Sequence, residues 1–226
     1  MFDIKKFAVA LFGALSLFTA PLAQAATDQQ NLVERARMTI DDLKKDREFG
    51  NARDLLKNAK GVMIIPKLVK GGFFFGGEGG EGMLLTRNGQ NEWSHPAFYT
   101  MASASFGLQI GLEESELVLF VMSDRALNDF MSDEFKIGAQ AGLAIVTLGS
   151  EAEASTTTTL HADIIVWSSA TGAYAGLTLN GSLIKPRDSW NEAYYGRSES
   201  VRDIVSKRAV QNPGAAGLRQ ELASIS

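Results

Sequence analysis

The amino-acid sequence predicts an α+β fold: a curved antiparallel β-sheet or barrel-like core with N-terminal helices, one short central helix and C-terminal helices. Three observations lead to this prediction. Near the N-terminus, apolar residues recur at three- and four-residue steps, which is typical of amphipathic helices. After Gly61 they gather instead in short β-type runs separated by turn signals. Glycines recur inside those runs, which indicates a sheet that bends strongly.

Residues 1–25 have the features of a cleaved secretory signal peptide. Two lysines precede a short apolar run (7–18), and Ala23 and Ala25 form an A-x-A cleavage signal. The run is shorter than the ~20 residues that cross a bilayer. We therefore expect cleavage near Ala25 and a periplasmic or secreted protein whose mature part, residues 26–226, is a single domain.

Residues 28–60 are expected to form the N-terminal helices. Gly50 and Asn51 interrupt the apolar pattern, so we expect two helices, the second with Leu55 and Leu56 on its inner face. The apolar positions that share one face of the first helix are Leu32, Val33, Ala36, Ile40 and Leu43.

Residues 61–187 are expected to hold the β-rich core. Asn88 and Gly89 lie between two extended stretches and predict a two-residue hairpin turn, because a type I′ turn needs positive φ at both central positions. A second hairpin turn is expected at Thr171. Between the two turns, Ser123 is in place to cap the N-terminus of the short central helix.

Residues 198–224 are expected to form the C-terminal helices. Ser200 followed by Asp203 has the spacing of a capping box, which marks a helix start. Pro213 and Gly214 then separate this helix from a last one.

The stretch from Gly71 to Gly82, GGFFFGGEGGEG, holds seven glycines and three consecutive phenylalanines. Glycine inside a strand weakens packing unless a bulge, a bend or a close backbone approach requires it. We therefore expect a small sheet that curves tightly, with aromatic side chains filling the space beside it. Other glycines in strand-like segments are Gly107, Gly111, Gly138, Gly142 and Gly176.

Recognisable catalytic, cofactor and metal motifs are missing from the sequence. The glycines of the stretch 77–82 match the G-x-G-x-x-G spacing, but a strand and a turn follow them where a dinucleotide site needs a helix. There is no cysteine, and the two histidines, His95 and His161, are isolated in sequence, so a transition-metal site is not expected. His95 is interpreted as a hydrogen-bonded structural residue. We expect no catalytic residues, no cofactor and no enzymatic activity.

Charge also limits the partners that the chain can bind. The formal net charge is −4, and without the leader it becomes more negative. Nucleic-acid binding needs a clustered positive field, so we expect no nucleic-acid partner.

Lys67 and Lys70 stand just before the three phenylalanines, Phe73, Phe74 and Phe75. In a strand, Phe73 and Phe75 share one face and Phe74 takes the other. The interpretation that we favour places these rings in the core, because apolar β runs are usually buried. The alternative is a membrane-contact patch, in which each cation gains ~1 kcal/mol near an anionic leaflet.

Six segments, in this order, resemble the SYLF domain family: AKGVMIIPKLVKGGFFFGGEGGEGMLL, FGLQIG, SDRALNDFM, FKIGAQAGLAIVTLG, GAYAGLTLNGSLI and EAYYG. The resemblance covers nearly the whole chain after the leader. It implies a phospholipid-binding module, with phosphoinositide preference in eukaryotes and actin binding in fungal members. This chain departs from the family's R-G-G-x-G pattern, where it has Glu78-Gly79-Gly80-Glu81-Gly82, and it has Ser150 where the family often has an arginine. Both changes remove positive charge, so selectivity for polyphosphoinositides is not expected.

The leading hypothesis is a non-enzymatic protein that binds phospholipid headgroups or the membrane surface in the bacterial envelope. The amphipathic N-terminal helix would supply interfacial contact. The candidate lipid-binding residues are Lys44, Lys45, Lys60, Lys67 and Lys70 for phosphate and Phe74 for apolar insertion.

A second hypothesis is a structural or protein–protein interaction module of the periplasm that binds another envelope protein without binding lipid. The absence of a visible catalytic set and an exposed β-prone threonine run, residues 156–159, both allow it. Actin is not expected as a partner, because it is absent from that compartment.

Overall fold

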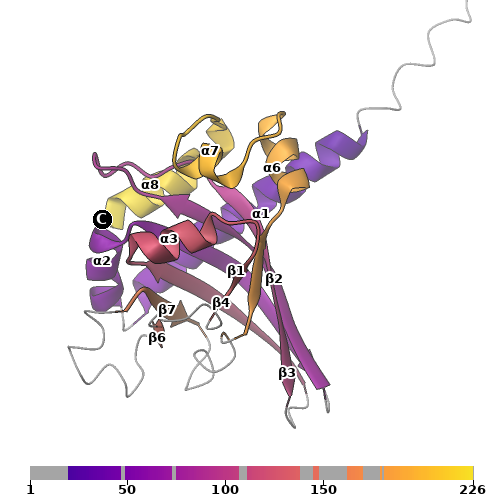
Figure 1. Ribbon diagram of the computed structural model, residues 1–226, viewed down its shortest axis with the longest axis vertical. Coiled ribbons are helices and arrows are strands. Elements are labelled where there is room, and N and C mark those ends of the chain that lie inside the picture. Colours follow the sequence, from indigo (N-terminus) through magenta and orange to yellow (C-terminus); the bar gives the residue numbers. More distant parts are fainter. Residues whose placement is uncertain are drawn as a thin grey trace, which may run out of the picture.

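The computed structural model describes residues 20–46, 49–72, 75–106, 111–137, 145–147, 162–169, 179 and 181–225. Figure 1 shows a curled sheet with helices packed on both of its faces. The helices are α1 (Ala20–Lys45), α2 (Phe49–Asn58), α3 (Asp124–Phe130), α6 (Asp188–Tyr195), α7 (Val201–Val205), η2 (Pro213–Ala215) and α8 (Ala216–Ile225). The strands are β1 (Gly61–Gly72), β2 (Phe75–Thr86), β3 (Ala97–Phe106), β4 (Gly111–Val121), β5 (Phe135–Lys136), β6 (Ile145–Thr147), β7 (Ile164–Ser168) and β8 (Leu183–Pro186).

The described strands form one eight-stranded sheet in the order β5-β8-β3-β2-β1-β4-β7-β6. All neighbouring pairs are antiparallel except β6 and β7, which run parallel. Four long strands, β1 to β4, make up the centre. The predicted α+β fold with a curved antiparallel sheet is therefore confirmed, with one parallel pair added at an edge.

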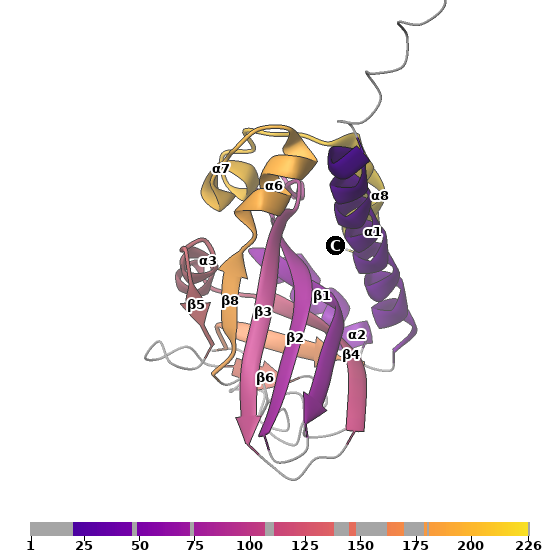
Figure 2. The same cartoon turned by 90° about the vertical axis from the view of Figure 1, so that its right-hand side faces the viewer.

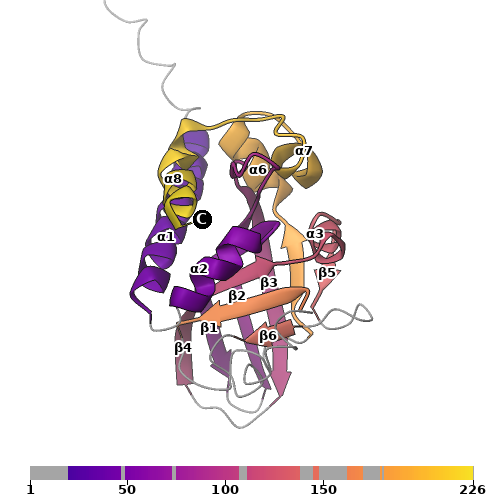
Figure 3. The same ribbon diagram turned by 90° about the vertical axis from the view of Figure 1, so that its left-hand side faces the viewer.

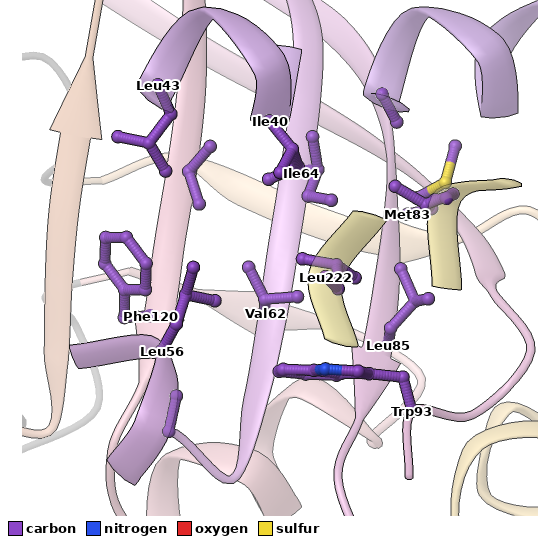
Figure 4. Packing of buried hydrophobic residues seen from close by; sticks show 14 of the residues in the cluster. Ile40, Leu43, Leu56, Val62, Ile64, Met83, Leu85, Trp93, Phe120 and Leu222 are labelled. Carbon is purple, nitrogen blue, oxygen red and sulfur yellow. The ribbon is translucent and has the colours of Figure 1, made fainter. Parts of the chain in front are cut away.

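Each face of the sheet carries its own hydrophobic core, because successive side chains of a strand point to opposite faces. On one face, β1 contributes Val62 and Ile64 to a cluster with α1, α2 and α8, part of which Figure 4 shows. On the other face, Met63 and Ile65 pack with α3 and α7. Figure 3 shows α1 and α8 lying side by side over the first face. Burial on both faces explains why the start of β1 is uniformly apolar.

Helix α1 follows the predicted periodicity, with Leu32, Val33, Ala36, Ile40 and Leu43 all buried. Its apolar face is therefore part of the core and is not available to a bilayer, contrary to the expectation that this face supplies interfacial contact. Helix α1 ends at Lys45 and α2 begins at Phe49, so Gly50 lies inside α2 and does not separate the two helices. The helix begins at Ala20, within the proposed leader, and the cleavage near Ala25 stays a prediction.

The predicted two-residue hairpin at Asn88 and Gly89 is wrong. The connection from β2 to β3 is longer and contains one isolated bridge between Arg87 and Trp93. The Asn88 side chain accepts hydrogen bonds from the backbone N–H groups of residues 90 and 92, and Asn91 takes the positive φ of 63°. Asparagine tolerates this conformation, so the turn uses it in place of the glycine. The second predicted turn, at Thr171, lies outside the described residues.

Helices α3 and α7 each begin directly after the serine that was predicted to cap them. Ser123 Oγ accepts from the backbone N–H of Ala126 at the start of α3, as predicted. Ser200 does the same for Asp203 at the start of α7. Helix α6 was not predicted from the sequence. It ends at Gly196, which has the left-handed conformation with φ of 69°.

A β-bulge in β1 explains part of the glycine-rich stretch. The register of β1 shifts between Ile64 and Lys67 against β2, and Pro66, which has no N–H to donate, occupies the irregular position. The bulged backbone presses against β2. A Cβ added at Gly80 would lie 2.5 Å from the Lys67 carbonyl oxygen, and one at Gly82 would lie 2.6 Å from that of Ile64. The expected close backbone approach is thus found at these two glycines.

Replacing Gly82 with alanine is expected to lower the free energy of unfolding by about 1–3 kcal/mol, because the new methyl group overlaps the backbone of the bulge. The matched control is Gly79→Ala on the same strand, where the nearest atom to an added Cβ is the Met101 carbonyl oxygen at 3.5 Å. This control should change the free energy by less than about 0.5 kcal/mol. Urea unfolding of the two variants measures the difference, and equal losses would contradict the bulge as the reason for Gly82.

Candidate functional site

A polar groove lies on the surface where α1 meets the β1–β4 pair. In Figures 2 and 3 the C-terminal end of α1 comes down beside β4. The groove has a volume of about 420 Å³. It is lined by Arg35 from α1, Pro66 and Lys67 from β1, Glu114, Ser115 and Glu116 from β4, and Ser169 after β7.

The bulge at Pro66 turns Lys67 toward this groove. Ile64 faces the α1 side of the sheet, so strict alternation would place Lys67 on the opposite side with Ile65. The register shift reverses the alternation after Pro66. Lys67 Nζ then lies 2.6 Å from Glu114 Oε1, and both side chains are largely exposed.

Glu116 is anchored in the groove by bonds from two elements. Its Oε1 accepts a hydrogen bond of 2.8 Å from Thr39 Oγ1 on α1. Its backbone N–H donates to Ser169 Oγ at 2.9 Å, and Ser169 N–H donates to the Glu116 carbonyl at 3.1 Å. Burial raises the pKa of the Glu116 carboxyl, and the bond from Thr39 opposes that rise. The position of this carboxylate is therefore fixed by the fold.

Arg35 is a cation of the groove for which the described residues provide no partner. It projects from the exposed side of α1, and within the described residues its guanidinium has no ion pair or hydrogen bond. Arg37, by contrast, lies 2.6 Å from Glu34 on the same helix. One turn beyond Arg35 is Met38, which is 48% exposed and is the one large apolar side chain that the described part of the chain exposes.

Three of the predicted lipid-binding lysines lie away from the groove lining, each in an ion pair. Lys44 pairs with Glu221 of α8. Lys45 Nζ is 2.9 Å from Asp42 Oδ1 on its own helix. Lys60 Nζ is 2.8 Å from Asp124 Oδ2 at the start of α3. Of the proposed lysines, the structure brings Lys67 into the groove.

Lys70 lies near the C-terminal end of β1 and Phe74 follows that strand in sequence. Lys70 is in register with Glu78 on β2 and with Glu113 on β4. Phe74 lies outside the described residues, and its role in insertion stays a prediction. Arg35 was not identified as a site residue from the sequence, because only the bulge places Lys67 in the groove that Arg35 lines.

His95 has a structural environment in the connection between β2 and β3. Its Nδ1 accepts from the backbone N–H of Asn212 at 3.2 Å, and its Nε2 lies 3.4 Å from Arg219 Nη1. Burial, with Arg219 and Arg208 nearby, lowers the pKa of His95 from 6.5 to about 4. Among the described residues no three His, Asp or Glu side chains are placed to hold a metal ion. His161 lies outside them.

Every helix in the described part of the chain is too short or too polar to span a lipid bilayer.

Fold and groove together define an α+β domain with a polar surface groove beside its longest helix. The sequence profile of the Ysc84 family, described as Las17-binding protein actin regulator, matches residues 102–225, which is more than half of the chain. The chain belongs to this family, and the resemblance to SYLF domains is confirmed.

Relatives from yeast and from animals match most of this chain. It is 32% identical to the protein YSC84 of Saccharomyces cerevisiae over 173 residues, which is 75% of this chain and 37% of that protein. It is 30% identical to LAS seventeen-binding protein 3 of the same organism over 174 residues, 76% of this chain and 38% of that one. The human SH3 domain-containing YSC84-like protein 1 is 28% identical over 152 residues, 67% of this chain and 44% of that one. The chain therefore spans less than half the length of these relatives.

Acid is expected to destabilise the fold through His95. The unfolded chain binds a proton on this histidine below pH ~6.5, whereas the folded state does so only below about 4. The free energy of unfolding should therefore fall as the pH is lowered from 6.5 to 4, by about 1–2 kcal/mol once solvent screening is allowed for.

His95→Asn keeps an acceptor for the Asn212 N–H but does not titrate, so the variant should lose this part of the pH dependence. Urea unfolding at pH 7, 5.5 and 4 measures both proteins. An unchanged pH slope in the variant would contradict the assignment.

Proposed function

We propose that this chain is a non-enzymatic protein that binds phospholipid headgroups at a membrane surface of the bacterial envelope, and that the groove at Arg35 is its contact site. The observation that carries the proposal is an arginine without a partner in the described residues, at the edge of a preformed polar groove. A guanidinium offers paired N–H donors that match the oxygens of a phosphate, and it stays charged at every physiological pH.

Lys67 supplies a second cation on the same groove. Its partner Glu114 is 60% exposed, and ion pairs between exposed side chains contribute only about 0–1 kcal/mol. A phosphate can therefore replace Glu114 at small cost. Lys67 thus keeps its proposed role in phosphate binding, and Arg35, which lines the same groove, is the second proposed cation in place of Lys44, Lys45 and Lys60.

Met38 adds a small apolar surface to the proposed contact with the membrane. It lies one turn from Arg35 on the exposed side of α1, where it reaches the interfacial region if the groove faces a bilayer. The other apolar side chains of α1 are held in the core. The proposed attachment is therefore peripheral, with α1 remaining in the fold, and it should weaken as salt screens the charges.

The names of the relatives favour a second candidate function, binding of another protein. The yeast relatives and the family description are named for Las17 binding and actin regulation. The chain covers 37–38% of the two yeast proteins. That the region shared with this chain is the part responsible for Las17 binding or actin regulation is therefore a separate proposal. The alternative of an interaction module that binds an envelope protein without lipid belongs to the same class. Co-sedimentation with actin filaments, in the absence of lipid, tests the actin form of this candidate.

The proposed lipid contact is tested by sedimentation of the mature protein with vesicles that contain anionic phospholipid. Arg35→Glu should lower the binding constant by about thirtyfold, because a cation that gains ~1 kcal/mol near the surface becomes an anion that loses a similar amount. The matched control is Arg53→Glu, an exposed arginine of α2 outside the groove, which should change binding by less than about twofold.

Equal losses in the two variants would mean that total charge and not the groove governs binding. Absence of wild-type binding to vesicles of any composition would overturn the proposed function itself.

A further inference from the structure

The groove carries charges of both signs side by side. Its cations, Arg35 and Lys67, come from α1 and β1, and its carboxylates, Glu114 and Glu116, come from β4. Alternate residues of a strand share a face and lie roughly 6–7 Å apart. Both carboxylates therefore belong to the face of the sheet that α1 covers, on the same side as the two cations.

This arrangement disfavours a ligand of one charge sign. A purely anionic group drawn to Arg35 would also meet Glu114 and Glu116, and a purely cationic group would meet Arg35. A ligand that joins a phosphate to an ammonium by a short linker satisfies both sets. When its phosphate takes Lys67, Glu114 is released from its ion pair and becomes an acceptor for the ammonium.

The residues that line the groove also determine which kind of ammonium group it can bind. Quaternary ammonium groups have no N–H donors and are recognised by aromatic faces, and the residues that line the groove in the described part of the chain include no aromatic ring. A primary ammonium has three N–H donors. Acceptors for them are present in the two carboxylates and in the hydroxyl of Ser169.

We infer that the groove selects a phosphoethanolamine headgroup, with the phosphate on Arg35 and Lys67 and the primary ammonium at Glu114 and Glu116. The inference rests on the proposed function and names its lipid class, a zwitterionic headgroup in place of an anionic one. Glu116 is the better-defined acceptor, because Thr39 and Ser169 hold it in place before any ligand arrives.

Vesicle binding of the mature protein tests this inference with three lipid mixtures: phosphatidylcholine alone, and phosphatidylcholine with an equal share of either phosphatidylethanolamine or phosphatidylglycerol. The wild type should bind the ethanolamine vesicles about fivefold more tightly than phosphatidylcholine alone, the effect of one exposed ion pair. The double variant Glu114→Gln with Glu116→Gln should lose this preference. Its affinity for vesicles with phosphatidylglycerol should rise, because the two carboxylates that repel an anionic headgroup have been removed.

Two single substitutions complete the set. Glu116→Gln keeps the size of the side chain and an acceptor for Thr39, so it should fold and still lose most of the preference. Glu192→Gln removes an exposed carboxylate of α6 that is not part of the groove, and it should keep the preference. The comparison among variants also removes any effect of ethanolamine lipids on vesicle curvature.

Free phosphoethanolamine and inorganic phosphate, added at equal concentration, separate the sources of the ligand chemistry. Phosphoethanolamine should displace the wild type from ethanolamine vesicles more strongly than phosphate does. Equal displacement, or an ethanolamine preference that survives in the double variant, overturns the inference. Wild-type binding to phosphatidylglycerol vesicles without any ethanolamine preference also overturns it while the proposed function stands, and binding to no vesicle overturns both. Binding of free phosphoethanolamine without vesicle binding overturns the lipid assignment.

Discussion

The packing of the β1 bulge against the glycines of β2 is the contact on which the rest of the structure depends. Gly80 and Gly82 let the backbone of β1 approach closer than any side chain would allow. The shift at Pro66 then reverses which side chains of β1 face α1. Upstream of it β1 contributes Ile64 to the core beneath the helices, and downstream it places Lys67 at the surface. This bulge thus separates the part of β1 that the helices cover from the part whose side chains reach the surface.

The groove differs from the basic patch that the sequence suggested. Lys44, Lys45 and Lys60 are each neutralised by a neighbouring carboxylate, so they add little local field. The groove instead combines an arginine that has no partner among the described residues with Lys67, which is paired to an exposed carboxylate, and two carboxylates. In a chain with a net charge of −4, the proposed headgroup binding would depend on local geometry and balanced charges and not on a general positive potential.

The sequence allowed the fold class to be predicted because its strongest signals are local. The helical period of Leu32 to Leu43, the caps at Ser123 and Ser200 and the glycines of β2 each act within a few residues. The site could not be predicted in the same way. Arg35 and Lys67 meet only because a bulge reverses the alternation after Pro66, and counting every second residue places Lys67 on the wrong face. Pro66 was the available signal, since a proline within a strand marks an irregular position.

The most direct test of the groove as the headgroup site is a titration of the isotopically labelled mature protein with a short-chain phosphatidylethanolamine, followed by amide chemical shifts. The account predicts that the largest shifts fall on Arg35, Lys67, Glu116 and Ser169, from four segments that are far apart in sequence. If the largest shifts fell instead on the residues between β1 and β2 or on α2, with the groove amides unchanged, the account would be wrong.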